Sequence, residues 1–306
     1  MTKKIHSFLA ISVLAFAFVG VTSAAENLHD LIKSENYSAA TSRLNMLYSD
    51  HQNGRKAENR LIGEVGTAVS VLPKNHKLQL DHFIELNQNS VAGKFTSALY
   101  YQWNGLRIRG QKSNQETDQK KLDALRVNLN QSVTLFQSVI KDDPKSYLAH
   151  MYNGINYSYI SSRKASDREF KAGLAIKPLN YRIWERYIIY NQPRWGGSYE
   201  RMDSVVKEMG PAARKNRVLQ RLKGLPLIDK AEELIRKGEF VKAEDLVFRA
   251  LDFGSHRRYG QTVRYLLNRV THLVTKLQAA ESRKKPMLCI QKINAFENWQ
   301  LNAVSS

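Results

Sequence analysis

Pro144 and Pro178 stand 34 residues apart, and each closes an amphipathic segment, residues 139–144 in one case and residues 174–178 in the other. A period of 34 residues is typical of helix–turn–helix units, which stack because no unit can bury its apolar face alone. Helix-forming residues dominate the chain, and no long strand-like alternation appears. The spacing therefore predicts an all-α fold built from stacked helix pairs.

The clearest predicted unit lies between these two prolines. Gly154 and Tyr157 stand where the tetratricopeptide repeat has the small and aromatic residues of its first helix, and Phe170 falls in the second helix. Tyr37 and Ala40 show an aromatic-then-small pattern near the start of the chain; the small residue lets two helix backbones approach. We expect a tetratricopeptide-like solenoid, a right-handed stack of about 11 to 13 helices.

Apolar residues at helical spacing predict where individual helices lie. The repeat pattern returns at residues 225–253, and the regular stripe of residues 262–280 predicts a capping helix. The polar residues 49–60 predict a loop, and the helix predicted over residues 61–72 is expected to end near Pro73. The other predicted helices cover residues 61–72, 78–88, 91–109 and 119–141.

These changes of pattern divide the chain into five parts. They are a signal peptide (1–25), an N-terminal helical region (26–90), a tetratricopeptide-like core (91–205), a basic helical repeat with the capping helix (206–285) and a C-terminal docking segment (286–306).

The N-terminus has the features of a secretory signal. Lys3 and Lys4 precede an apolar stretch, residues 8–21, and small residues follow it up to position 25. This arrangement predicts a Sec-type signal peptide cleaved after one of residues 23–25 and a periplasmic or secreted protein. The alternative is an uncleaved membrane anchor, for which the apolar stretch is short. No later segment is long and apolar enough to span a bilayer.

Cys289 is the only cysteine. An intramolecular disulfide and a four-cysteine zinc site are therefore excluded. Its apolar neighbours indicate a buried thiol; a catalytic or intermolecular role is the alternative.

The chain is strongly basic. Its formal net charge is +19, and removal of Lys3 and Lys4 leaves +17, because residues 1–25 contain no acid. Such a charge favours anionic partners, which in a bacterial envelope are lipid headgroups, lipopolysaccharide, wall polymers or acidic proteins. We expect no nucleic acid. The alternative is a generally basic surface without a specific anionic partner.

Much of this charge lies in the C-terminal half. Residues 207–285 hold 19 Lys or Arg against nine Asp or Glu. One stretch reads as a basic amphipathic helix, which is suited to an anionic surface, although it also fits the solvated side of a core helix. The candidate anion-binding residues are Arg214, Lys215, Arg217, Arg221 and Lys223.

A glycine pair interrupts the helix that carries Trp184. Two glycines permit backbone conformations closed to other residues, and the helix restarting after Ser198 offers free amides near Arg201. Trp195 can anchor a peptide, or it can be a buried side chain that locks the turn. The candidate partner-binding residues are Arg194, Trp195, Gly196, Gly197 and Ser198.

These residues carry a resemblance. The chain is similar to a bacterial family of unknown function that has a Pro-Arg/Lys-Trp-Gly-Gly-Ser motif on tetratricopeptide-like helices. The similarity covers roughly residues 90–205, and it implies a helical-repeat fold and export but no activity, cofactor or catalytic residue. The matching features are residues 193–198, Met202, residues 103–110, the Asp143–Pro144 pair and Trp184.

The sequence offers no assembled reaction chemistry. Asp81, His82 and Glu85 lack the second histidine of a His-x-x-x-His metal site, and Gly93 with Lys94 lacks the rest of a phosphate loop. The acids Glu232, Glu233, Glu244 and Asp245 are expected on exposed helix faces. We therefore predict no catalytic residue, no metal site and no cofactor.

We expect an exported, non-catalytic helical-repeat protein that binds a protein or peptide partner in the bacterial envelope. The first alternative is a binder of anionic envelope surfaces or polymers through the basic C-terminal half. A hydrolytic enzyme acting on wall material is the third reading.

Overall fold

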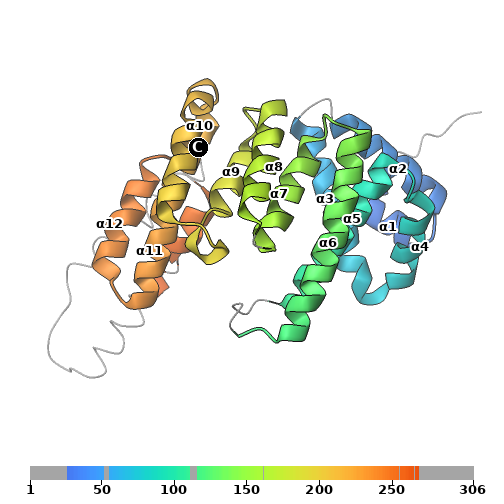
Figure 1. Cartoon of the computed structure of the whole chain (residues 1–306), viewed down its shortest axis with the longest axis horizontal. Coiled ribbons are helices and arrows are strands. Elements are labelled where there is room, and N and C mark those ends of the chain that lie inside the picture. The colour runs from blue at the N-terminus through green and yellow to red at the C-terminus, as the bar shows by residue number, and fades with distance from the viewer. Residues whose placement is uncertain are drawn as a thin grey trace, which may run out of the picture. The chain divides into compact units, whose positions relative to one another are not determined.

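The computed structural model of the chain describes residues 26–51, 55–110, 116–160, 162–254, 256–264 and 266–268. Every regular element in these residues is a helix, and they contain no strand (Figure 1). The predicted all-α class is confirmed.

The chain divides into two compact units, residues 1–83 and 84–306. The helices of the first unit are α1 (Leu28–Lys33), α2 (Tyr37–His51), α3 (Arg55–Asn75) and most of α4 (Lys77–Asn87), which ends in the second unit.

The first unit encloses a small apolar core, and a partly buried carboxylate connects three of its helices. Leu44, Leu61 and Phe83 are fully buried in it. Glu64 accepts a hydrogen bond from the backbone N–H of Leu28 at 3.1 Å and two from the guanidinium of Arg43, at 2.5 and 3.0 Å. One carboxylate therefore ties α1 and α2 to α3.

One prediction for the first unit is wrong and another is confirmed. Most of the predicted loop at residues 49–60 is helical, because α2 continues to His51 and α3 begins at Arg55. His51 and Glu58 are buried within these helices, so the polar composition of this stretch does not mark a loop. The helix over residues 61–72 was predicted to end near Pro73, and α3 ends two residues later at Asn75; so close to a C-terminus, proline disturbs few helical hydrogen bonds.

The second unit contains the remaining helices. They are α5 (Val91–Arg109), α6 (Gln119–Asp142), α7 (Tyr147–Tyr159), α8 (Arg163–Ile176), α9 (Tyr181–Ile189), η1 (Pro193–Trp195), α10 (Tyr199–Lys215), η2 (Arg217–Gly224), α11 (Leu225–Lys237) and α12 (Phe240–Leu251). Residues 257–264 and 266–268 are also helical.

Consecutive helices of the second unit pack on one another, from the α5–α6 pair to the α11–α12 pair (Figure 1). The start of α7 at Tyr147 and the start of α9 at Tyr181 are 34 residues apart. Gly154 of α7 lies against the ring of Phe170 in α8, where a Cβ would be 3.1 Å from ring carbons. Gly154 and Phe170 thus lie in two successive helices, as predicted, and the glycine lets the ring of Phe170 approach α7.

Several predictions lie wholly or largely outside the described residues. These are the signal peptide (1–25), Cys289, the docking segment (286–306) and most of the capping helix (262–280). No helix in the described residues is long and apolar enough to cross a membrane.

Candidate functional site

The glycine-rich interruption forms a tight loop between α9 and α10, which we call the Trp-Gly-Gly loop (residues 192–198). The α9 helix ends because Gln192, which precedes Pro193, adopts an extended conformation with φ −64° and ψ 152°. Asn191 closes the helix end by donating its side-chain amide to the Tyr187 carbonyl at 2.9 Å. The loop then contains one short 3₁₀ turn, η1.

The two glycines are required for different reasons. Gly196 has φ +75° and ψ 16°, in the left-handed region that side chains disfavour. Gly197 lies so close to the end of α9 that three backbone atoms of Asn191 would be within 2.9 Å of a Cβ at this position. Its amide donates to the Gln192 carbonyl at 3.1 Å, which closes the loop on itself.

Arg163, at the start of α8, holds the loop from inside. Its guanidinium donates to the carbonyl of Tyr190 at 2.6 Å and to the carbonyl of Trp195. Burial lowers the pKa of Arg163, and the charge of Arg201 lowers it further. A half-buried cation thus fixes both ends of the turn through backbone oxygens rather than through side chains.

Ser198 begins α10 as predicted. It is the N-cap residue, and its hydroxyl accepts a hydrogen bond from the Arg201 amide at 3.2 Å. The Arg201 guanidinium reaches back to Asp167 of α8 at 2.5 Å and to the Asn191 side chain at 3.2 Å. Arg201 therefore joins α8, α9 and α10 around the loop.

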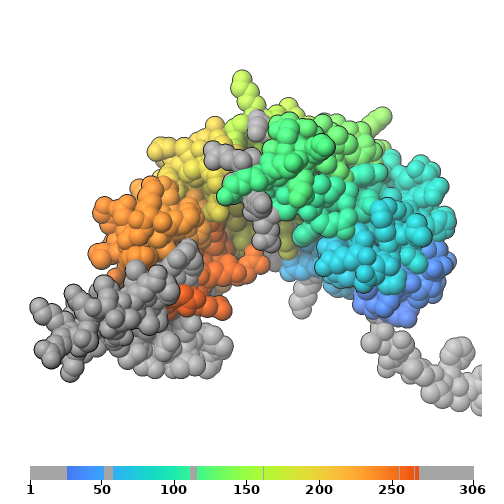
Figure 2. Space-filling model, turned by 90° about the horizontal axis from the view of Figure 1, so that it is seen from below, coloured from blue at the N-terminus to red at the C-terminus, as the bar shows by residue number. Residues whose placement is uncertain are grey.

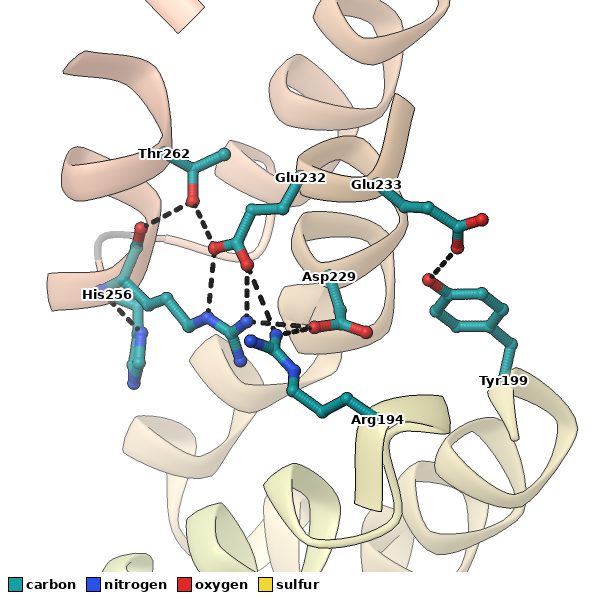
Figure 3. Close-up of polar contacts among 8 residues, drawn as sticks. Arg194, Tyr199, Asp229, Glu232, Glu233, His256 and Thr262 are labelled. Carbon is teal, nitrogen blue, oxygen red and sulfur yellow. Dashed lines mark hydrogen bonds and ion pairs between the residues drawn. The ribbon is translucent and has the colours of Figure 1, made fainter. Parts of the chain in front are cut away.

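Arg194 connects the loop to α11 (Figure 3). Its Nη2 donates to Asp229 and lies 3.3 Å from Glu232, and both carboxylates also bind Arg258. Arg258 makes contacts of 2.9 Å to Asp229 and 2.7 Å to Glu232, and the Thr262 hydroxyl lies 2.9 Å from Glu232. We call these five residues the charge network.

The centre of the charge network is shielded from water, and Arg194 lies at its exposed edge. The side chain of Asp229 is 6% exposed and that of Arg258 is 16% exposed. Burial raises the pKa of Glu232, but Arg258, Thr262 and the charge of Arg194 more than offset this, so its pKa lies below the ordinary value. Glu232 is therefore negatively charged near neutral pH.

The helical segment that carries Arg258 is held beside α9 and α11. His256 accepts the backbone N–H of Arg258 through Nδ1 at 3.1 Å, so its Nε2 is free to donate to Glu185 of α9 at 3.0 Å. In Figure 2, the orange region, which contains α11 and α12, adjoins the red-orange region that contains residues 256–264. The loop is thus anchored through Arg194 to a braced part of the fold.

Trp195 packs with two tyrosines and remains half-buried. Its ring lies 5.0 Å from that of Tyr159 in an edge-on contact and 5.6 Å from that of Tyr190. Trp195 was expected either to anchor a peptide or to be buried and lock the turn. The indole helps to lock the turn, and part of it faces solvent.

The loop lines one wall of a cavity of about 350 Å³. Trp195 and Gly196 lie on that wall, and the guanidinium-bearing residues Arg109 of α5, Arg126 of α6 and Arg194 line the cavity with them. We call this the arginine pocket. Sequence reasoning did not connect Arg109 or Arg126 with the loop.

An apolar groove of about 510 Å³ lies between α8, α9 and α10. Leu174, Leu179 and Trp184 line it, with Lys171 and Lys215 also on its walls. Trp184 is 5% exposed and donates its indole N–H to the Pro178 carbonyl at 2.9 Å. The groove is therefore shaped by the turn that closes the 34-residue unit.

The predicted basic amphipathic helix is wrong as a single α-helix. The α10 helix ends at Lys215, and η2 begins at Arg217. Asn216 breaks it with φ −128° and ψ 96°, and its amide donates to the Leu179 carbonyl at 3.1 Å. The candidates Arg214, Lys215, Arg217 and Arg221 are exposed and Lys223 is half-buried, and none forms an ion pair with another described residue.

The expectation for Glu232 is wrong, since its side chain is only 18% exposed and belongs to the charge network rather than to an exposed helix face. Its neighbour Glu233 accepts from the Tyr199 hydroxyl at 2.8 Å and from Lys237 at 2.5 Å. Among the described residues, no three His, Cys, Asp or Glu side chains converge as a metal-binding group. Asp81 pairs with Lys77, and His82 packs edge-on against Tyr37 at 4.8 Å.

One family model matches the centre of the second unit. Residues 168–218 match a family described as a domain of unknown function (DUF4034). The matched segment contains the whole Trp-Gly-Gly loop and every residue that lines the apolar groove. No curated protein matches the chain. The match supports the expected similarity to a family of unknown function, and it connects that similarity to the loop and the groove.

Proposed function

We propose that this chain is an exported, non-catalytic binding module of the bacterial envelope, whose helix pairs stack as a tetratricopeptide-like solenoid and whose partner is a protein or peptide. The recurrence of helix starts at Tyr147 and Tyr181 supports the repeat architecture. The binding site that we propose is the Trp-Gly-Gly loop with its cavity.

One observation carries this proposal. Side chains from other helices bind the backbone and flanks of the loop, while part of the Trp195 indole stays accessible. Arg163 binds the backbone carbonyl of Trp195, and Arg194 is tied to α11. A preformed aromatic contact loses little conformational entropy on binding, which favours affinity. Tryptophan and arginine are also the residue types most enriched among the dominant contacts of protein interfaces.

The proposed location rests on the N-terminal sequence. Lys3 and Lys4, the apolar residues 8–21 and the small residues before Glu26 have the order of a cleavable signal. Mass spectrometry of the exported chain is expected to show a mature N-terminus at Ala24, Ala25 or Glu26. A chain that stays membrane-bound with residues 1–25 intact contradicts the proposed location.

A pull-down from envelope extract tests the proposed function. The tagged full chain is expected to retain a discrete protein through a wash at about 0.5 M salt, which screens most exposed charge contacts. Trp195→Ala is expected to abolish this retention, because it removes the indole while the backbone bond to Arg163 stays. Trp103→Ala is the matched control, since Trp103 is 45% exposed and lies outside the cavity lining.

Two results count against this function. Equal retention by wild type and Trp195→Ala places the binding elsewhere on the chain. Equal loss in Trp103→Ala and Trp195→Ala attributes the effect to general surface hydrophobicity. Both variants are compared by thermal denaturation, so that a loss of fold is recognised separately.

A second candidate function is binding to anionic envelope surfaces. It is favoured by the exposed side chains of Arg214, Lys215 and Arg217, which have no acidic partner among the described residues. Such binding depends on unscreened charge, so it is expected to disappear at about 0.5 M salt and to weaken in Arg217→Gln.

A further inference from the structure

The arginine pocket combines charged and apolar lining residues. Arg109, Arg126 and Arg194 come from three different elements, and no acidic side chain of the described residues lines the cavity. Guanidinium groups present several N–H donors in a planar fork that matches carboxylate geometry. Three arginines and no acid in the lining of one cavity indicate a site for an anionic group.

The carboxylates near the pocket are already occupied. Asp123 contacts Arg126 at 3.3 Å, at an exposed position, and Asp229 is held by Arg194 and Arg258. Arg194 uses only Nη2 for its two acids, so its other nitrogens have no partner in the described part of the chain. A ligand can therefore bind Arg194 without breaking the charge network.

A half-buried cation lies behind the loop wall. The Arg163 guanidinium would be 3.4 Å from a Cβ at Gly196, and it donates hydrogen bonds to the carbonyl oxygens of Tyr190 and Trp195. A partly buried charge is screened less than a surface charge. Arg163 therefore adds to the positive potential at the pocket without being neutralised by a directly bonded carboxylate.

Part of the lining is apolar. Leu122 and Leu125 of α6, which we call the α6 wall, line the cavity together with Ile160 after α7 and the ring of Tyr159. Ligand sites commonly combine apolar surface with a few polar or charged groups that fix orientation. This lining fits an acidic side chain that lies next to an apolar one.

Two helix C-termini at the arginine pocket disfavour the binding of an anion. The C-termini of α5 and α7 lie at the pocket, and each contributes the equivalent of roughly half a negative charge at most. The lining guanidiniums carry full charges, and the helix-end effect fades within one turn. The net potential therefore still favours an anion.

We infer that the arginine pocket binds an acidic peptide segment of the partner, with a carboxylate on the three guanidiniums and a neighbouring apolar side chain on the α6 wall. This inference rests on the proposed function and names the chemistry of the partner. The net charge of +19 is consistent with an acidic partner.

Two pools of short synthetic peptides test the inference. One pool alternates acidic and apolar residues, and the other replaces each acid by its amide of the same shape. The immobilised full chain is expected to capture the acidic pool at least about tenfold more than the amide pool at about 0.15 M salt, as charge-assisted hydrogen bonds imply.

Arg126→Gln is the decisive variant, because Arg126 is exposed and its loss spares the fold. It is expected to reduce capture of the acidic pool about tenfold. Arg107→Gln and Arg217→Gln each remove the same charge outside the pocket and are expected to leave capture nearly unchanged. Equal loss in all three variants would mean that net charge alone attracts the peptides, and the inference would be overturned.

The remaining outcomes are also distinct. Equal capture of the acidic and amide pools overturns the inferred acidic preference. It leaves the proposed function untouched, because that function is tested separately by the envelope pull-down with Trp195→Ala. Displacement of the acidic pool by millimolar inorganic phosphate would identify a phosphate site instead. We expect phosphate to leave capture by the wild-type chain largely intact.

Discussion

Replacing Gly197 with alanine is expected to lower the free energy of unfolding by about 3 kcal/mol, at the upper end of the cost of overpacking. The added methyl group would meet three backbone atoms of Asn191 within 2.9 Å. Backbone atoms at a helix end cannot rotate away as a side chain can, so the loop must open. Urea denaturation followed by circular dichroism measures the change.

Gly210→Ala is the matched control. Gly210 lies within α10, only a short distance along the chain, and a Cβ there would meet no atom within 4 Å. Alanine in an open helical position stabilises by about 0.5–1 kcal/mol. Similar stability changes for the two variants would contradict the close approach that defines the Trp-Gly-Gly loop.

Replacing Arg258 with methionine is expected to cost about 3 kcal/mol, the lower end of the range for breaking a buried ion pair. The variant leaves Asp229 and Glu232 with Arg194 as their shared cation, and Arg194 is 44% exposed. Two carboxylates in a shielded site then repel each other with less compensation. Thermal and urea denaturation both report this loss.

Arg249→Met serves as the comparison, because Arg249 pairs with Asp245 at 3.3 Å where both side chains are more than half exposed. Exposed pairs of this kind contribute little to stability. A loss in Arg258→Met no larger than the loss in Arg249→Met would mean that the charge network does not hold the loop region together.

The stability of the wild-type chain and that of Arg258→Met are expected to depend differently on pH. The pKa of Glu232 lies below its ordinary value of 4.5 in the folded chain, so its contribution to stability is present above that value and is lost as the pH falls through the folded pKa. The wild-type chain is therefore expected to lose stability below about pH 4.5. Arg258→Met is expected to lose less over the same range, because Glu232 then binds a proton more readily.

Local features of the fold were predictable from the sequence, because they depend on residues close in the chain. Ser198 caps α10, and Gly154 and Phe170 lie in the two successive helices in which their spacing placed them. Helix ends were less predictable where polar residues continue a helix, as at the end of α2 and the start of α3. Asn216 broke a basic stretch whose periodicity alone suggested continuity.

The candidate site was predictable only in its centre. The glycine pair and Trp195 are neighbours in the sequence, so the loop could be identified. The residues that hold it, Arg163, Asp229 and Arg258, lie about 30 or more positions away or pair across elements. Sequence spacing carries no information on such contacts, although Asp229 and Glu232 do share one face of α11 at i and i+3.

The most direct test of the central claim is the affinity of the captured partner for wild type, Trp195→Ala and Arg217→Gln at about 0.15 M and about 0.5 M salt. We predict that binding survives the higher salt, weakens at least about tenfold in Trp195→Ala and is unchanged in Arg217→Gln. The account would be contradicted if binding vanished at the higher salt, weakened in Arg217→Gln and stayed unchanged in Trp195→Ala. That result would assign the function to the basic residues of the C-terminal half.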